Sequence, residues 1–216
     1  PAHSAAQSYT LTFPTTAPSS GKALVTDGSG NLSFSSAGGL NLISTSTTSS
    51  GVSEIDITSG IDSTYTKYMI SIINLHPASD HELRMRVFTG TGGSQAVYTS
   101  SDYQYVMHTA RVNSSSLIFD SNNGGYDHFP IHSGQYIDSG VANACLNAEI
   151  FLHNPADTTF HTHITGTFSL ENASDNKMTH GMTASRFKQT TAITGVRFYM
   201  GSGNIDNAII KLYGIS

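Results

Sequence analysis

The histidines are the residues whose number and spacing most invite a chemical role, because the chain has ten of them in 216 residues. His161 and His163 are separated by one residue, so on a β-strand both imidazoles point to the same side. Three copies of the chain around a threefold axis would bring six imidazoles together, enough for an octahedral transition-metal site. A polar strand that faces solvent explains the pair without a metal, and we expect none. The opposite side of this strand would carry Phe160, Ile164, Phe168 and Leu170.

The remaining histidines lie at predicted turns or strand ends, with no spacing that fixes two or three of them on one surface. We expect them to be surface or partly buried polar residues. They are His76, His81, His108, His128, His132, His153 and His180, besides His3 near the start of the chain.

The chain lacks the short patterns of nucleophilic catalysis and phosphate binding. No G-x-S-x-G elbow is present, and the Gly-rich stretch 88–95 is not followed by Lys-Ser/Thr as in a phosphate loop. Carboxylates that converge from loops could serve glycoside hydrolysis, although turn capping is the simpler explanation for them. These candidates are Asp102, Asp120, Asp127 and Asp138. We predict that the protein is not an enzyme and needs no cofactor.

Composition narrows the class of partner. The formal net charge is −5 and no basic run occurs, so we expect no nucleic-acid binding. No stretch approaches the roughly 18 apolar residues of a membrane span, so we expect no membrane insertion. Cys145 is the single cysteine, which excludes an intrachain disulfide, and we expect a small buried hydrophobe at this position.

Short apolar-polar alternations, separated by Gly, Asn, Asp and Pro, predict an all-β protein made of two packed antiparallel sheets, a jelly-roll-like β-sandwich. Residues 121–125 predict a turn, and 179–188 could form one helical turn. In 82–87, apolar residues face the core and two arginines face the surface. The strand candidates are 55–57, 68–75, 83–87, 103–107, 117–119, 145–152, 159–170, 195–200 and 208–213.

The first 46 residues differ from the rest of the chain. A short strand is predicted over 9–13, and 22–26 with 32–34 predict a hairpin around Asp-Gly-Ser-Gly-Asn. The Ser/Thr/Gly run 35–53 is typical of a linker that leads into the first sandwich strand. We therefore predict an extended arm over residues 1–46 and a sandwich over 47–216. The hairpin is too small to bury a core alone and needs partner surfaces.

Residues 102–136 combine Tyr, His and Asn in presumed loops. This mixture suits hydrogen bonding and stacking against sugars or a protein surface. Loops that merely anchor buried aromatic rings would have the same composition.

The N-terminal segment SYTLTFPTTAPSSGKALVTDGSGNLSF resembles a recurring segment of tailed-phage fibre and virion structural proteins, which wraps around trimeric partners. ITSGIDSTYTKYMISIINLHPASD and SGNIDNAIIKLYGIS are similar to the opening and closing strands of β-sandwich domains in phage structural proteins. The resemblance implies a homotrimer located in the virion. It also implies that one set of apolar residues forms the trimer or attachment interface, namely Tyr9, Leu11, Phe13, Leu24, Leu32 and Phe34.

Three functions follow from this reading. The first is a trimeric tail-fibre or adhesin subunit, whose sandwich contacts a host surface glycan or protein through its loops. The second is a capsid decoration, cement or head-fibre protein that stabilises or adorns the head together with other virion proteins. The third, a polysaccharide or cell-wall hydrolase carried on the particle, is the least supported, because no acid-base constellation stands out.

Overall fold

The computed structural model describes residues 10–17, 22–36, 39–112, 114, 116–132 and 134–216. The chain divides into two compact units, Pro1–Asn41 and Leu42–Ser216. The predicted boundary at residues 46 and 47 falls inside strand β3 (Leu40–Thr48), most of which belongs to the second unit. The linker predicted over residues 35–53 is wrong where β3 forms. The Thr residues of β3 favour extended backbone, and the strand pairs with β15 at the edge of the large sheet.

The first unit contains the predicted hairpin, formed by β1 (Lys22–Thr26) and β2 (Leu32–Ser36) in antiparallel register. Asp27 closes its turn by accepting hydrogen bonds from the backbone N–H groups of Ser29 and Asn31, at 2.8 and 3.2 Å. Gly30 has a φ of +91°, which favours glycine, and an added Cβ would lie 2.7 Å from the Thr10 carbonyl oxygen. The strand predicted over 9–13 is reduced to a single parallel bridge between Thr12 and Asn31 among its described residues.

The second unit is a sandwich of two antiparallel sheets, as predicted; the jelly-roll connection pattern stays a prediction. The small sheet has the order β10-β6-β14-β4, with β7 also paired to β6. Its strands are β4 (Glu54–Ile57), β6 (Leu83–Thr89), β7 (Ala96–Val97), β10 (Phe129–Pro130) and β14 (Ile193–Met200), and the 3-10 turn η1 (Gly92–Ser94) precedes β7.

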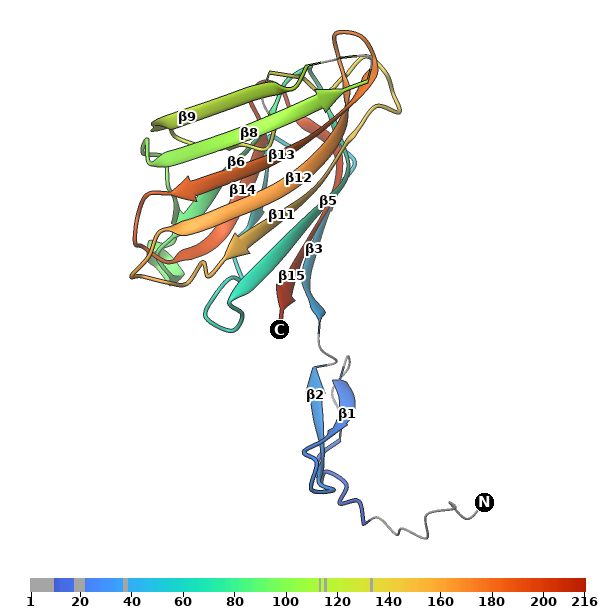
Figure 1. Cartoon of the computed structure of the whole chain (residues 1–216), viewed down its shortest axis with the longest axis vertical. Coiled ribbons are helices and arrows are strands. Elements are labelled where there is room, and N and C mark those ends of the chain that lie inside the picture. Colours follow the sequence, from blue (N-terminus) through green and yellow to red (C-terminus); the bar gives the residue numbers. More distant parts are fainter. Residues whose placement is uncertain (1–9, 18–21, 37–38, 113, 115, 133) are drawn as a thin grey trace. The chain divides into compact units, whose positions relative to one another are not determined.

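The large sheet has the order β3-β15-β5-β11-β12-β13-β8-β9. Figure 1 shows its strands side by side in front of β6 and β14. Besides β3 it contains β5 (Lys67–Pro77), β8 (Tyr103–Arg111), β9 (Ile118–Tyr126), β11 (Leu146–His153), β12 (Thr162–Asn172), β13 (Lys177–Phe187) and β15 (Ile205–Ile215).

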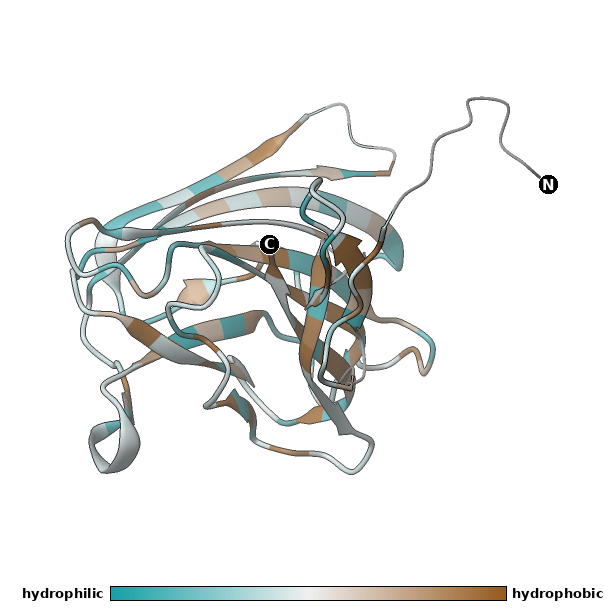
Figure 2. Ribbon diagram, turned by 90° about the horizontal axis from the view of Figure 1, so that it is seen from below, coloured by the Kyte–Doolittle hydropathy of each residue, from teal (hydrophilic) through white to brown (hydrophobic). Residues whose placement is uncertain are grey.

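The core lies between the two sheets and follows from the alternation of the strands. In β6, Leu83, Met85 and Val87 are completely buried, while the two arginines between them face outward as predicted. Hydrophobic and hydrophilic residues alternate along many of the strands in Figure 2. Tyr68 and Ile70 of β5 supply the matching buried side chains of the large sheet.

Four local predictions are wrong. The helical turn predicted over 179–188 is absent, because residues 179–187 form most of β13, and the turn predicted over 121–125 lies within β9. Phe160 precedes β12 and is 72% exposed, although Ile164, Phe168 and Leu170 are buried as expected. Cys145 is only half-buried, because its thiol lies beside the polar side chains of Asn74 and Asn147 instead of in the core.

Gly181 explains how β13 fits against its neighbours although its inward side chains are small, apart from Phe187 at the end of the strand. An added Cβ at this position would lie 2.7 Å from the backbone oxygen of His108 and would overlap the ring of Phe168. The Phe168 ring of β12 therefore occupies the space that a side chain on β13 would take. No helix among the described residues is both long enough and apolar enough to cross a membrane.

Candidate functional site

The outward side of the large sheet carries a row of basic and polar side chains in direct cross-strand register. Lys67 of β5 pairs with His153 of β11, and His153 pairs with His163 of β12. His163 pairs with Arg186 of β13, which pairs with Gln104 of β8. Their neighbours along each strand are buried, so these five residues point away from the core. We call this set the cationic row.

Arg186 is held by neutral groups. Its Nη2 donates a hydrogen bond to Oε1 of Gln104, and Nε2 of Gln104 donates to the backbone oxygen and Oδ1 of Asn123, at 2.8 and 2.9 Å. No carboxylate lies within 4 Å of the Arg186 guanidinium among the described residues. The side chain is therefore oriented while its charge is not neutralised by an ion pair.

An apolar row runs beside the cationic row, again in register across the sheet. Phe151 of β11 lies between Met69 of β5 and Thr165 of β12, and the row continues through Ala184 of β13 to Val106 of β8. The Lys67 ammonium lies 4.5 Å from the centre of the Phe151 ring, which joins the two rows by a cation–π contact. Val106 is 54% exposed. We call the cationic and apolar rows together the open face.

Two hollows lie on the open face and meet at Val106 and Ala184. The first has a volume of about 440 Å³ and is lined by Gln104, Asn123, His163 and Arg186, among others. The second has a volume of about 450 Å³ and is bordered by Phe119, Phe151 and Met182, among others. A hollow that contains several polar side chains thus adjoins a more apolar one, which is the arrangement of a site for an amphipathic ligand.

The predicted histidine pair lies at one end of the open face. His161 and His163 are both exposed and line one hollow with Phe160 and a third histidine, His153. Burial, the nearby Lys67 ammonium and His163 together lower the pKa of His153. No group of three or more His, Cys, Asp or Glu side chains that could hold a metal occurs in the part of the chain that the structure describes.

The outward side of the small sheet carries more arginines than the open face, and each has an acidic partner. Arg84 contacts Glu82 at 2.8 Å, and Arg86 pairs with the Asp127 carboxylate. Arg197 donates two hydrogen bonds to Asp56, at 2.7 and 2.6 Å, and also contacts Glu54 at 2.8 Å. The Arg86 guanidinium packs over the Tyr199 ring, 4.9 Å from its centre. We call this set the paired face.

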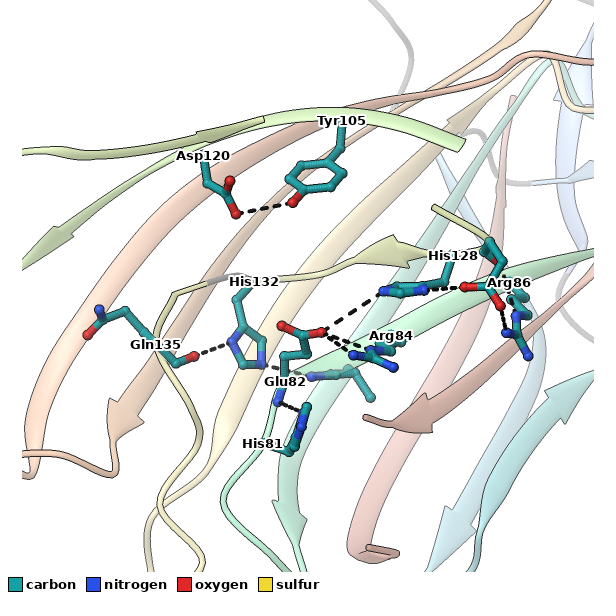
Figure 3. A network of polar contacts seen from close by, with 11 residues as sticks. His81, Glu82, Arg84, Arg86, Tyr105, Asp120, His128, His132 and Gln135 are labelled. Atoms are coloured by element: carbon teal, nitrogen blue, oxygen red, sulfur yellow. Dashed lines mark hydrogen bonds and ion pairs between the residues drawn. The ribbon is translucent and has the colours of Figure 1, made fainter. Parts of the chain in front are cut away.

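Two buried histidines attach the segment after β9 to the small sheet (Figure 3). The backbone N–H of Leu83 donates to Nε2 of His132 at 3.0 Å, so Nδ1 carries the proton and donates to the Gln135 carbonyl at 2.7 Å. Complete burial lowers the pKa of His132 to about 4, so this imidazole is neutral near pH 7. His128 donates to Asp127 at 2.7 Å, and burial lowers its pKa as well.

The predicted carboxylates are each engaged in local structure. Asp102 accepts hydrogen bonds from Tyr98 and Gln189, and Asp120 accepts one from Tyr105. Asp127 belongs to the paired face, and Asp138 caps the backbone N–H of Gly140 at 2.8 Å.

The loops expected over 102–136 are largely the strands β8 and β9, and the tyrosines at 103 and 105 are buried. Residues of this region that line the two hollows of the open face include Gln104, Val106, Phe119 and Asn123.

Five of the six predicted interface residues are described, and Tyr9 lies outside the described residues. Leu24 pairs with Phe34, and Leu32 precedes Phe34 by two residues on the same strand. All three side chains therefore share one face of the hairpin. The most exposed members of the set are Phe13 at 68%, Leu11 at 51% and Leu24 at 45%.

Sequence reasoning missed Arg186 and the polar side chains that orient it. One signal was present: no Asp or Glu occurs between Asp175 and Asp206, so Arg186 has no acidic residue within ten positions along the chain. Arg197 lies in the same stretch and still finds acidic partners on β4, so only the fold separates the two arginines.

Comparison of the chain with models of known protein families, with curated proteins and with solved structures found no match.

Proposed function

We propose that this chain is a structural subunit of a tailed-phage particle, a trimeric tail-fibre or adhesin component whose sandwich contacts the host surface. The observation that carries the proposal is the exposure of apolar side chains in the small N-terminal unit. Leu11, Phe13 and Leu24 are each about half exposed or more. A two-stranded hairpin is marginal in water by itself, and symmetric copies of the same surface are a common way to cover it.

The resemblance of this segment to phage fibre proteins supports the same reading. The hairpin turn quoted for that resemblance is built as the motif requires, with Gly28 and Gly30 at positive φ and Asp27 accepting from the turn backbone. Interchain pairing through Leu24, Leu32 and Phe34 would use one face of a preformed ribbon.

Sedimentation of the full chain tests the trimer. We expect three times the chain mass for the wild type, and the chain mass for the triple variant Leu11→Ser, Phe13→Ser, Leu24→Ser. The matched control is Val106→Ser, Val112→Ser, Phe119→Ser, which changes three exposed apolar residues of the sandwich and should stay trimeric. A wild type that sediments as a monomer at micromolar concentration would contradict the proposal.

Gold-labelled antibodies against the purified chain test where the protein lies on phage particles whose genome encodes it. Label at the tail tip supports the attachment role. Label spread over the head would instead favour the decoration or cement protein, and particles without label would sink both.

A further inference from the structure

We propose that the open face binds an acidic polysaccharide through the carboxylate groups of its sugars. This inference rests on the proposed attachment function and names the ligand class of the sandwich. The cationic row provides the charges, and the apolar row provides a surface for the C–H faces of the sugar rings. Sequence reasoning placed host contact in loops, whereas these side chains stand on paired strands.

Charge complementarity is the first argument for an anionic ligand. The chain is acidic overall, with a formal charge of −5, yet Lys67 and Arg186 of the open face have no carboxylate within 4 Å among the described residues. The acidic residue of β11, Glu149, lies two rows from the cationic row, opposite Ser71 and Thr167. The cations are therefore available to an anion from outside.

The geometry of Arg186 is the second argument. Its contact with Gln104, itself fixed by Asn123, holds the guanidinium in one direction over the first hollow. A planar guanidinium binds a carboxylate through two parallel hydrogen bonds, and prior orientation reduces the entropy lost on binding. Neighbouring strands lie about 4.8 Å apart, so Lys67 and Arg186 are separated by roughly 14 Å across the sheet. Two fixed cations at this separation suit a chain with repeated acidic groups.

The apolar row is the third argument, because apolar surface beside the cations favours a sugar chain over a small inorganic anion as the ligand. The second hollow holds the exposed surface of Val106, Phe119 and Met182 directly beside the first, which contains Gln104, Asn123 and Arg186. Sugars present apolar C–H patches and polar hydroxyl edges together, and sites for them combine apolar surface with planar amides. Gln104 and Asn123 are the amides in this position.

The experiment measures binding of the full-length chain to immobilised polygalacturonate, alginate and polysialic acid, with neutral dextran as the uncharged reference. We expect binding to at least one acidic polymer, none to dextran, and weakening as salt is raised, because exposed charges are screened. Arg186→Gln should bind roughly tenfold more weakly, since a charge-assisted bidentate contact is lost. Arg186→Lys, which keeps the charge and loses the fork, should fall in between.

Lys177→Gln is the matched control, because it removes the same charge from the other end of β13, where Lys177 contacts Asp175. It should bind like the wild type, and thermal unfolding confirms that each variant is folded. Equal weakening in Lys177→Gln and Arg186→Gln, equal binding to dextran, or no binding to any acidic polymer would each overturn the inference. A face that instead joins two copies of the chain would appear as an assembly that Arg186→Gln dissociates, and this would overturn it too.

Antibody labelling of particles separates the two proposals. A chain that binds acidic polymers through Arg186 but does not label virions leaves this inference standing and removes the phage function. A chain that labels the tail and ignores acidic polymers does the reverse.

Discussion

On the outward side of the small sheet, every arginine of the paired face contacts a carboxylate. On the outward side of the large sheet, Arg186 donates to the neutral Gln104, and no carboxylate of the described residues lies within 4 Å of it. Both sheets alternate buried and outward residues in the same way, so the difference is not one of secondary structure. It arises from what lies next to each guanidinium. Acidic residues from β4 and from the segment after β9 reach the paired face, and none of them reaches Arg186.

The histidines repeat this contrast. On the small-sheet side, His132 is completely buried and both ring nitrogens are bonded to backbone groups. On the open face, His163 is exposed beside an unneutralised cation. Groups whose hydrogen bonds and charges are satisfied within the chain stabilise the fold, whereas groups left available in a fixed geometry can meet a ligand. The groups of the paired face therefore serve the fold, whereas the open face keeps the groups to which we ascribe ligand binding in our proposal.

The largest expected effect comes from removing the buried histidine. His132→Ala leaves the buried N–H of Leu83 without its acceptor and opens a space beside the Phe168 ring, whose centre is 5.8 Å away. We expect the free energy of unfolding to fall by about 3 kcal/mol. Urea denaturation measures this loss. The matched change on the open face, His163→Ala, should cost less than about 0.5 kcal/mol, and equal losses would remove the distinction between the faces.

Acid should weaken the fold through the same histidine. The folded pKa of His132 is about 4, below the ordinary value of 6.5, so between these pH values the unfolded chain binds a proton that the folded chain does not. Stability from this group is therefore complete above pH 6.5 and declines as the pH falls towards 4, by about 3 kcal/mol in total. The lowered pKa of His128 acts in the same direction.

Urea titrations at several pH values test this. The His132→Gln variant should lose most of the slope between pH 6.5 and 4. If its stability follows pH as the wild type does, other groups carry the acid sensitivity.

Strands with large apolar residues at every second position could be predicted from the sequence, as β6 shows, with Leu83, Met85 and Val87 inward. β13 could not. Most of its inward residues, such as Thr179 and Gly181, are small or polar, and the Phe168 ring of β12 fills the space beside Gly181; Phe187 at the end of the strand is the one large apolar residue among them. The sequence did not predict the full length of β9 either. Asn and Gly at 122–125 are typical of a turn, although the backbone continues there as a paired strand.

The candidate site was harder to predict than the fold, because it depends on residues far apart in the chain. Alternation indicated that Arg86 faces outward, but its partner Asp127 is 41 residues away. Arg186 and Gln104 are 82 residues apart and meet only through the pairing of β13 with β8. The hairpin could be predicted, because its turn residues are adjacent in sequence.

The smallest expected effect is a difference in coupling free energy between Arg86 and Arg186, each measured with its own hydrogen-bond partner. Removing Arg86 and Asp127 singly and together, as Arg86→Met and Asp127→Asn, should give a coupling free energy of about 1 kcal/mol. The value is modest because Asp127 is 39% exposed and solvent screens the pair.

The matching cycle on the open face uses Arg186→Met and Gln104→Leu and should give less than about 0.5 kcal/mol, because one partner is neutral and the site faces water. Each cycle compares the free energies of unfolding in urea of the wild type, the two single variants and the double variant. A coupling for Arg186 and Gln104 as large as that for Arg86 and Asp127 would mean that Arg186 serves the fold as its counterparts on the small sheet do. Its availability to an anion would then lose its energetic basis, even though no carboxylate lies beside it among the described residues.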